Sequence, residues 1–332
     1  MTNNHTNLWK RIYEIAKDRI NELAMIFVLI VLVVAFSFTS DNFFSQRNLI
    51  NVFRQVTMIG ITAFGLTFVL ITGGVDLSTG SMLALTGVIT TMLMVNLAMP
   101  PWLAIIIALL LSALMGLING VATVYLRIHS LVATLATMQI YSGIAFILTR
   151  GQTIYGFPDS FSVIGKGYIG IIPVPVVIMI TIMLLGWVVL NKTKLGRHTY
   201  AVGGNREAAK LSGINVKRIV IVAMMICGLS AGIAGIIMAS RVGSGQANIS
   251  ASFGFEVITA VMLGGGSIDG GEGKISGVLI GVLIMGLLSN GLVMLNVYEY
   301  YQLVIKGLVL LAAVGFDKMR QAYNISRAKA RV

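Results

Sequence analysis

The sequence is poor in cysteine and histidine, and this shortage excludes several kinds of site. Cys227 is the only cysteine among the 332 residues, so the chain can form no internal disulfide and offers no cysteine cluster for a metal ion. The three histidines, His5, His129 and His198, show no helical pairing with carboxylates, which disfavours a zinc site. We therefore assign no metal-ligating residue.

Charged residues are also scarce, and this excludes an ordinary water-soluble domain. They make up 11% of the chain, against 57% hydrophobic residues, whereas soluble domains carry about 25% charged residues. The net charge of +12 does not indicate a nucleic-acid partner, because the positive residues punctuate apolar segments instead of clustering on one exposed face. We expect an all-α integral membrane protein that binds no nucleic acid.

Apolar runs of about 20 residues, the length that crosses a bilayer, recur along the whole chain. We predict about ten transmembrane helices, which begin near Glu22, Val52, Ser81, Trp102, Leu131, Ile172, Val216, Phe253, Ile275 and Tyr301. The eighth, "FGFEVITAVMLGGGSIDGGEG", is short and is a candidate half-span or re-entrant segment. No Pro- or Ser-rich linker divides the chain, so residues 1–332 form a single transmembrane domain.

The positions of the basic residues predict the orientation in the membrane. Of the 24 lysines and arginines, five lie in one set of loops, Lys306 lies inside the last segment, and the other 18 lie in the opposite set of loops or in the terminal segments. Basic loops stay in the cytoplasm. Both termini are therefore predicted to be cytoplasmic, with the N-terminal segment 1–22, the loop 191–218 and the tail 317–332 on that side.

The loop 191–218 contains a short predicted helix. Asn205 can cap its start, Glu207 lies in the first turn, where an acid favours the helix dipole, and Gly213 suits the left-handed residue that ends a helix. We expect Gly203 and Gly204 before it to permit a sharp turn.

This predicted helix would present a small, apolar surface made by Ala208, Ala209 and Leu211. A basic loop that only anchors the chain needs charge but no cap, paired glycines or small-residue face. These extra features favour a helix that docks into the groove of a partner.

The same loop, "LGRHTYAVGGNREAAKLSGINV", resembles the cytoplasmic coupling loop of the ribose-type permeases, the membrane subunits of bacterial ABC importers for monosaccharides. The resemblance covers nearly the whole chain in order. It includes "NFFSQRNLINVFRQ", "GLTFVLITGGVDLSTGSMLALTG", "LINGV", "LATLATM", "AVMLGGGSIDGGEGKISGVLIG" and "YYQLVIKGLVLLAAVGFD".

The resemblance implies a permease of the bacterial cytoplasmic (inner) membrane that works with three partners. These are a cytoplasmic ABC ATPase subunit, a soluble or lipid-anchored sugar-binding protein and a second permease copy. It also implies that residues 205–213 contact the ATPase. Because "GKI" at residues 273–275 lacks the hydroxyl of a phosphate-binding loop, we expect no cofactor in this chain, with ATP and Mg bound by the ATPase.

Five polar residues in apolar surroundings are candidates for the pore or gate: Asp76, Ser78, Asn119, Gln139 and Glu256. A charge in the membrane costs about 2.5 to 3.5 kcal/mol or more, so such residues usually have a function. Each also has a structural alternative. Asp76 and Ser78 could cap the third span, Asn119 and Gln139 could hydrogen-bond between helices, and Glu256 could be an interfacial acid.

The position of Glu256 departs from the pattern of the permeases that the chain resembles. Those permeases show a Glu-Leu-Asp arrangement where this sequence has Gly254, Phe255 and Glu256. Two other functions are weighed against the importer. An ion-coupled secondary transporter would need several intramembrane acids, and an intramembrane enzyme would need a Ser-His or paired-acid site at matching depth. No such pair stands out, so we assign no catalytic residue.

Overall fold

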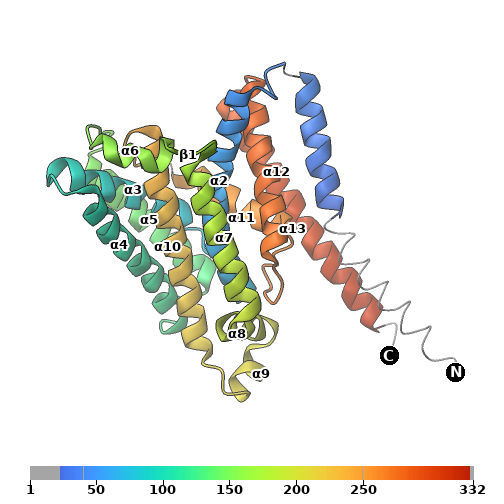
Figure 1. Ribbon diagram of the computed structural model, residues 1–332. Helices are drawn as coiled ribbons and strands as arrows, with labels where there is room; N and C mark the ends of the chain where they lie inside the picture. The colour runs from blue at the N-terminus through green and yellow to red at the C-terminus, as the bar shows by residue number, and fades with distance from the viewer. Residues whose placement is uncertain (1–22, 40, 249, 330–332) are drawn as a thin grey trace.

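The computed structural model describes residues 23–39, 41–248 and 250–329, and almost every regular element in them is a helix (Figure 1). After an apolar helix, Leu23–Thr39, come α2 (Gln46–Ile71), α3 (Thr79–Asn96), α4 (Pro101–Val124), α5 (Ser130–Thr149), α6 (Asp159–Lys166), α7 (Val174–Lys192), α8 (Lys194–Gly204), α9 (Arg206–Leu211), α10 (Val216–Val242), α11 (Ser250–Leu263), α12 (Ile275–Met294) and α13 (Glu299–Lys329). The predicted all-α fold class is thus confirmed. The segment 1–22 and residues 330–332 of the predicted tail lie outside the described residues.

The bundle has two distinct ends (Figure 1). The short helices α8 and α9 lie at one end, and α6 with the small β-hairpin lies at the other. In that hairpin β1 (Tyr168–Ile169) pairs antiparallel with β2 (Ile172–Pro173). We call the end that carries α8 and α9 the α8–α9 end, and the end that carries α6 and the β-hairpin the α6 end.

Within the described residues, seven helices are long and apolar enough to span a membrane: α2, α3, α4, α5, α7, α10 and α12. Two further apolar helices, Leu23–Thr39 and α11, are shorter. The shortness of α11 agrees with the prediction for the eighth segment. The helix α13 is 31 residues long but carries more charge.

The first residues of α2 were not predicted as helix, because the apolar run begins only near Val52. The helix begins six residues earlier, at Gln46, because Ser45 caps it by accepting a hydrogen bond from the Asn48 N–H. Asn48 itself is buried and donates to Asn290 Oδ1 at 3.2 Å. This polar first turn therefore packs against α12 instead of lying in water.

The helix α10 packs against α2, α3 and α4, and small residues allow its backbone to come close to α4. A Cβ atom added to Gly228 would lie 2.5 Å from the carbonyl oxygen of Ser112, and one added to Gly116 would lie 2.3 Å from that of Met224. Close approach at small residues is a usual means of helix association in membranes. The α4–α10 contact thus depends on these glycines.

We expect Gly228→Ala to lower the thermal unfolding midpoint of the protein in detergent. The added methyl group would meet main-chain atoms of α4, and overpacking of this kind costs about 1 to 3 kcal/mol. The matched control is Gly143→Ala on α5, because a Cβ atom there meets nothing within 4 Å. Equal midpoints for the two variants, measured by fluorescence-detected size-exclusion chromatography after heating, would contradict this account.

Candidate functional site

The short helix predicted in the loop 191–218 exists, and its termini are built as expected. α9 spans Arg206–Leu211, and Asn205 Oδ1 accepts a hydrogen bond from the Ala208 N–H at 3.0 Å. At the other end Gly213 has a φ of 80°, and the Ile214 N–H donates to the Ala209 carbonyl at 3.0 Å. This arrangement satisfies the last carbonyls of the helix.

The sharp turn predicted at Gly203 and Gly204 is not observed, so this prediction was wrong. Both lie in the last turn of α8 and have no positive φ, and the chain changes direction at Asn205, in extended conformation. Gly203 is needed because another backbone segment packs closely against it, and not because the chain turns there. A Cβ atom added to it would lie 1.7 Å from the Ile71 carbonyl oxygen, whereas one added to Gly204 would meet nothing within 4 Å.

Gly203 belongs to a contact between three backbone segments, which we call the glycine junction. It comprises the end of α2 (residues 71–73), the end of α8 (residues 203–204) and the loop after α11 (residues 269–271). The Gly271 N–H donates to the Ile71 carbonyl at 2.8 Å, and a Cβ atom added to Gly270 would lie 2.8 Å from Gly73. The junction therefore brings together two glycine-rich segments that are far apart in the sequence, residues 72–81 and residues 264–274.

Two side chains fasten α8 and α9 to the segments of the junction. Arg206 donates from Nη2 to the Thr72 carbonyl at 3.0 Å, and the Tyr200 hydroxyl donates to the Gly273 carbonyl at 2.5 Å. Burial raises the pKa of Tyr200, so its phenol stays protonated and remains a donor. These hydrogen bonds connect α8 and α9 to the end of α2 and to the loop before α12.

The surface of α9 differs from the predicted apolar face. Ala209 is buried against Val202, Ile219 and Val220, so it holds α9 on its own chain. Ala208 is exposed, and the side chain of Leu211 is 88% exposed. Among the predicted apolar residues of α9, Leu211 and Ala208 are therefore the two that are accessible to a partner.

Three of the predicted pore residues form one buried network near the α8–α9 end. Asp76, Ser78 and Asn119 are fully buried. Asp76 Oδ1 accepts from the Ser78 N–H at 2.9 Å and from the Ser78 hydroxyl at 2.6 Å, while Asn119 Nδ2 donates to Asp76 Oδ2 at 3.2 Å. Tyr141 of α5 reaches the same asparagine at 3.5 Å.

This network ties the loop between α2 and α3 to α4 and α5. Nothing in it opens onto one of the cavities described below, and its hydrogen bonds are of the kind that satisfy buried polar groups. The capping role predicted as the alternative for Asp76 is present in part, because its carboxylate holds the backbone at the residue that precedes α3. The role of these residues as a gate remains a prediction.

Two polar residues of α5, Thr134 and Gln139, lie in different surroundings. Thr134 is buried and accepts from the Leu77 N–H at 3.2 Å, so it belongs beside the Asp76 network. Gln139 is exposed and joins none of the hydrogen bonds of that network among the described residues. Gln139 is therefore not brought together with the other pore candidates.

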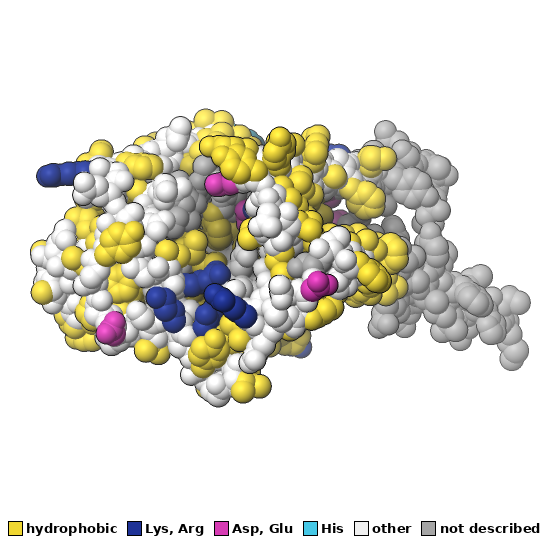
Figure 2. Space-filling view, turned by 90° about the horizontal axis from the view of Figure 1, so that it is seen from above, with side chains coloured by type: hydrophobic (Ala, Val, Ile, Leu, Met, Phe, Trp, Pro, Cys, Tyr) yellow, Lys and Arg dark blue, Asp and Glu magenta, His cyan; other side chains and the backbone are white. Residues whose placement is uncertain are grey.

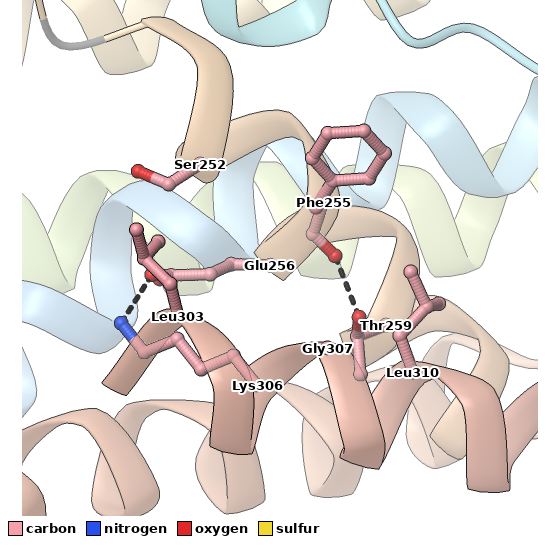
Figure 3. Close-up of a pocket in the computed structure, with 8 residues that line it drawn as sticks. All are labelled: Ser252, Phe255, Glu256, Thr259, Leu303, Lys306, Gly307 and Leu310. Atoms are coloured by element: carbon pink, nitrogen blue, oxygen red, sulfur yellow. Dashed lines mark hydrogen bonds and ion pairs between the residues drawn. The ribbon is translucent and has the colours of Figure 1, made fainter. Parts of the chain in front are cut away.

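Glu256 is paired instead of being an acid in open water. Its Oε1 lies 2.5 Å from Lys306 Nζ of α13, and both side chains are largely buried (Figure 3). Lys306, which lies inside the last predicted segment, is thus held in an ion pair within the protein. The pair closes one side of a cavity of about 290 Å³ that is lined mainly by apolar parts of α11 and α13. The pairing joins residues 50 positions apart, which no local pattern reveals.

Gly254, which stands where the resembling permeases carry an acid, lies in different surroundings from Glu256. Gly254 is buried against the start of α3, where an added Cβ atom would lie 3.2 Å from the Leu77 carbonyl oxygen. Phe255, between the two, is 45% exposed. The three consecutive positions thus face three different surroundings.

The described residues contain no group of three His, Cys, Asp or Glu side chains able to hold a metal ion. With several long apolar helices and a small helical hairpin fastened to one end, the fold is that of a polytopic helical membrane protein.

The chain belongs to the family described as "Branched-chain amino acid transport system / permease component", which matches residues 48–314. It is 41% identical over 296 residues to the ribose import permease protein RbsC of Bacillus subtilis (strain 168), covering 89% of this chain and 92% of that protein. It is 40% identical over 301 residues to the L-arabinose transport system permease protein AraH of Escherichia coli (strain K12), covering 91% and 92%. No solved structure matches the chain.

A third relative is the D-allose transport system permease protein AlsC of Escherichia coli (strain K12), 36% identical over 296 residues, with 88% of this chain and 90% of that protein covered. The resemblance to sugar permeases is thereby confirmed. The chain is a transport subunit of the bacterial cytoplasmic membrane, which supports the importer over the secondary transporter and the intramembrane enzyme.

Proposed function

We propose that this protein is the membrane permease of an ATP-driven ABC importer that carries a monosaccharide. The observation that carries the proposal is the α8–α9 hairpin, which offers Leu211 to a partner and is fastened to the end of α2 and to the loop before α12. A separate ATPase, which binds ATP and Mg, would dock on this hairpin. This chain would form the transport path and would bind no cofactor itself.

The proposed topology has ten crossings, with both termini and the α8–α9 end in the cytoplasm. Seven of the 18 basic residues on that side lie between residues 192 and 218, and a basic loop remains in the cytoplasm. The two short helices and α13 complete the seven long apolar ones. A sugar-binding protein, soluble or lipid-anchored, would then meet the α6 end.

The proposed mechanism begins at the hairpin. When the ATPase closes on ATP, it would move α9, and the glycine junction would transmit this motion to α2 and to the α11–α12 loop as rigid bodies. A second permease copy would supply the other wall of the transport path. The oligomeric state of the purified complex tests this second copy. No covalent chemistry by this chain is required.

The test is uptake by proteoliposomes that contain the permease with its ATPase and its binding protein. Radiolabelled D-ribose, L-arabinose and D-allose would be supplied in turn, with ATP, without ATP, and with a proton or sodium gradient in place of ATP. We expect uptake of at least one sugar that requires ATP and both partners. Uptake driven by a gradient without ATP would overturn the importer.

A further inference from the structure

A cavity of about 450 Å³ lies between α2, α10 and α11, and it is separate from the Asp76 network. Its polar lining consists of Gln55, Arg241, Ser252 and Glu256, and its apolar lining includes Met58 and Met238. Gln55 lies near the start of α2 and Arg241 near the end of α10, so the cavity is on the side of the α6 end. Pockets of about 300 to 1,000 Å³ are the usual size for small-molecule sites.

The surface at this end is positively charged beside a hollow (Figure 2). Arg54 donates to the Lys166 carbonyl at 2.9 Å, and Gly165, the neighbour of Lys166, packs against the backbone of Arg241. These three are among the five basic residues that fall in the less basic set of loops. These three residues are far apart in the sequence, so it is the fold that brings them together.

Several polar groups in the cavity have no partner within the part of the chain that the structure describes. Among the described residues, none hydrogen-bonds to the Gln55 amide or forms an ion pair with the Arg241 guanidinium. Glu256 uses Oε1 for Lys306, as Figure 3 shows, and no described residue donates to its Oε2. Half-buried polar groups left in this state favour a ligand that completes their hydrogen bonds.

The chemistry of the lining selects the kind of ligand. Arg241 only donates, the free oxygen of Glu256 only accepts, and Gln55 does both. A hydroxyl group can both accept and donate, so adjacent hydroxyls satisfy all three. The carboxylate already has Lys306 as its counter-ion, so a cation gains little here, and the second oxygen of Glu256 can accept from a hydroxyl but not from an anionic oxygen. The methionine side chains Met58 and Met238 suit the C–H faces of a small ring.

We propose that this cavity is a low-affinity binding site for an uncharged, hydroxyl-rich solute, held by Arg241, Glu256 and Gln55 on the side of the α6 end. The site rests on the proposed function, since it would be the first stop of the transported sugar inside the permease. The solute enters near Arg241 and leaves when α2 moves with the glycine junction.

The test uses cysteine labelling of the full permease–ATPase complex in nanodiscs without binding protein. Cys227 is fully buried, so the natural chain already has a low background. We expect Gln55→Cys to react with a small charged methanethiosulfonate and the reaction to slow when free sugar is added. A slowing of at least about threefold corresponds to sugar at about twice its dissociation constant.

The probe is the sugar that gives ATP-dependent uptake, and the matched control is Gln46→Cys. Gln46 lies on the same helix but lines a separate cavity with Ile171 and Ile172. Sugar should leave the labelling rate of Gln46→Cys unchanged. Betaine at equal osmolarity should slow the labelling of neither Gln46→Cys nor Gln55→Cys. Adding Arg241→Gln to Gln55→Cys should raise the sugar concentration needed for protection.

Two outcomes would overturn the site. One is an unchanged labelling rate of Gln55→Cys at all sugar concentrations, and the other is equal slowing at Gln46→Cys. Both can occur while ATP-dependent uptake is normal, which would leave the importer standing and remove only the site. Failure of uptake in the unmodified complex would instead remove the importer.

Discussion

Replacing Gly203 by alanine should reduce ATP-driven sugar uptake by about tenfold or more. The added methyl group would lie 1.7 Å from the Ile71 carbonyl oxygen, and that oxygen already accepts the Gly271 N–H. Neither atom belongs to a flexible side chain, so the backbones must separate. Overpacking of this kind costs about 1 to 3 kcal/mol, and 1.4 kcal/mol corresponds to a tenfold change in an equilibrium.

The adjacent Gly204→Ala is the matched control. A Cβ atom at this position meets nothing within 4 Å, and the backbone there has no positive φ. Alanine is also the better helix former, so the control should keep its uptake. The measurement is sugar uptake per permease molecule in proteoliposomes, compared between Gly203→Ala and Gly204→Ala. Equal uptake by the two variants would show that the glycine junction has no part in the mechanism.

Replacing Leu211 by aspartate should uncouple ATP hydrolysis from uptake. The leucine side chain is 88% exposed at the end of α9, so the substitution does not disturb the fold of this chain. In a docked complex, however, an unpaired carboxylate would be buried against the ATPase, which costs several kcal/mol. We expect about a hundredfold loss of uptake, at about 1.4 kcal/mol for each tenfold step, with the permease still in the membrane.

Leu126→Asp serves as the comparison for this variant. Leu126 is 67% exposed in the loop between α4 and α5, at the same end of the bundle but outside α9. Its uptake should remain within about twofold of the unmodified protein, as for surface substitutions in general. If Leu211→Asp transports as well as Leu126→Asp does, α9 is not the docking element. Ala209→Asp is less informative, because buried Ala209 tests only the stability of α9.

The sequence alone predicted the short helix α9 because its determinants are local. Asn205 accepts from a residue three positions later, and Gly213 lies two positions after the helix ends. Composition and apolar run length were likewise sufficient for the all-helical fold class. The start of α2 was misplaced because a cap at Ser45 and a contact to Asn290 outweigh the polarity of its first turn.

The roles of the remaining site residues could not be predicted because they depend on distant segments. Gly203 was interpreted as a turn residue, since nothing in its neighbourhood indicates Ile71 or Gly271. Asp76 and Asn119 are 43 positions apart, and Glu256 meets Lys306 across 50. The polarity of Asp76, Asn119 and Glu256 was visible in the sequence, but the partner that defines the role of each was not.

The main-chain contact at Gly203 has a mechanical consequence. Side chains can absorb a small displacement by changing rotamer, but the atoms that meet here belong to carbonyl and amide groups and have no such freedom. If an ATPase moves α9 as proposed, the movement would therefore reach the end of α2 with little loss at this contact.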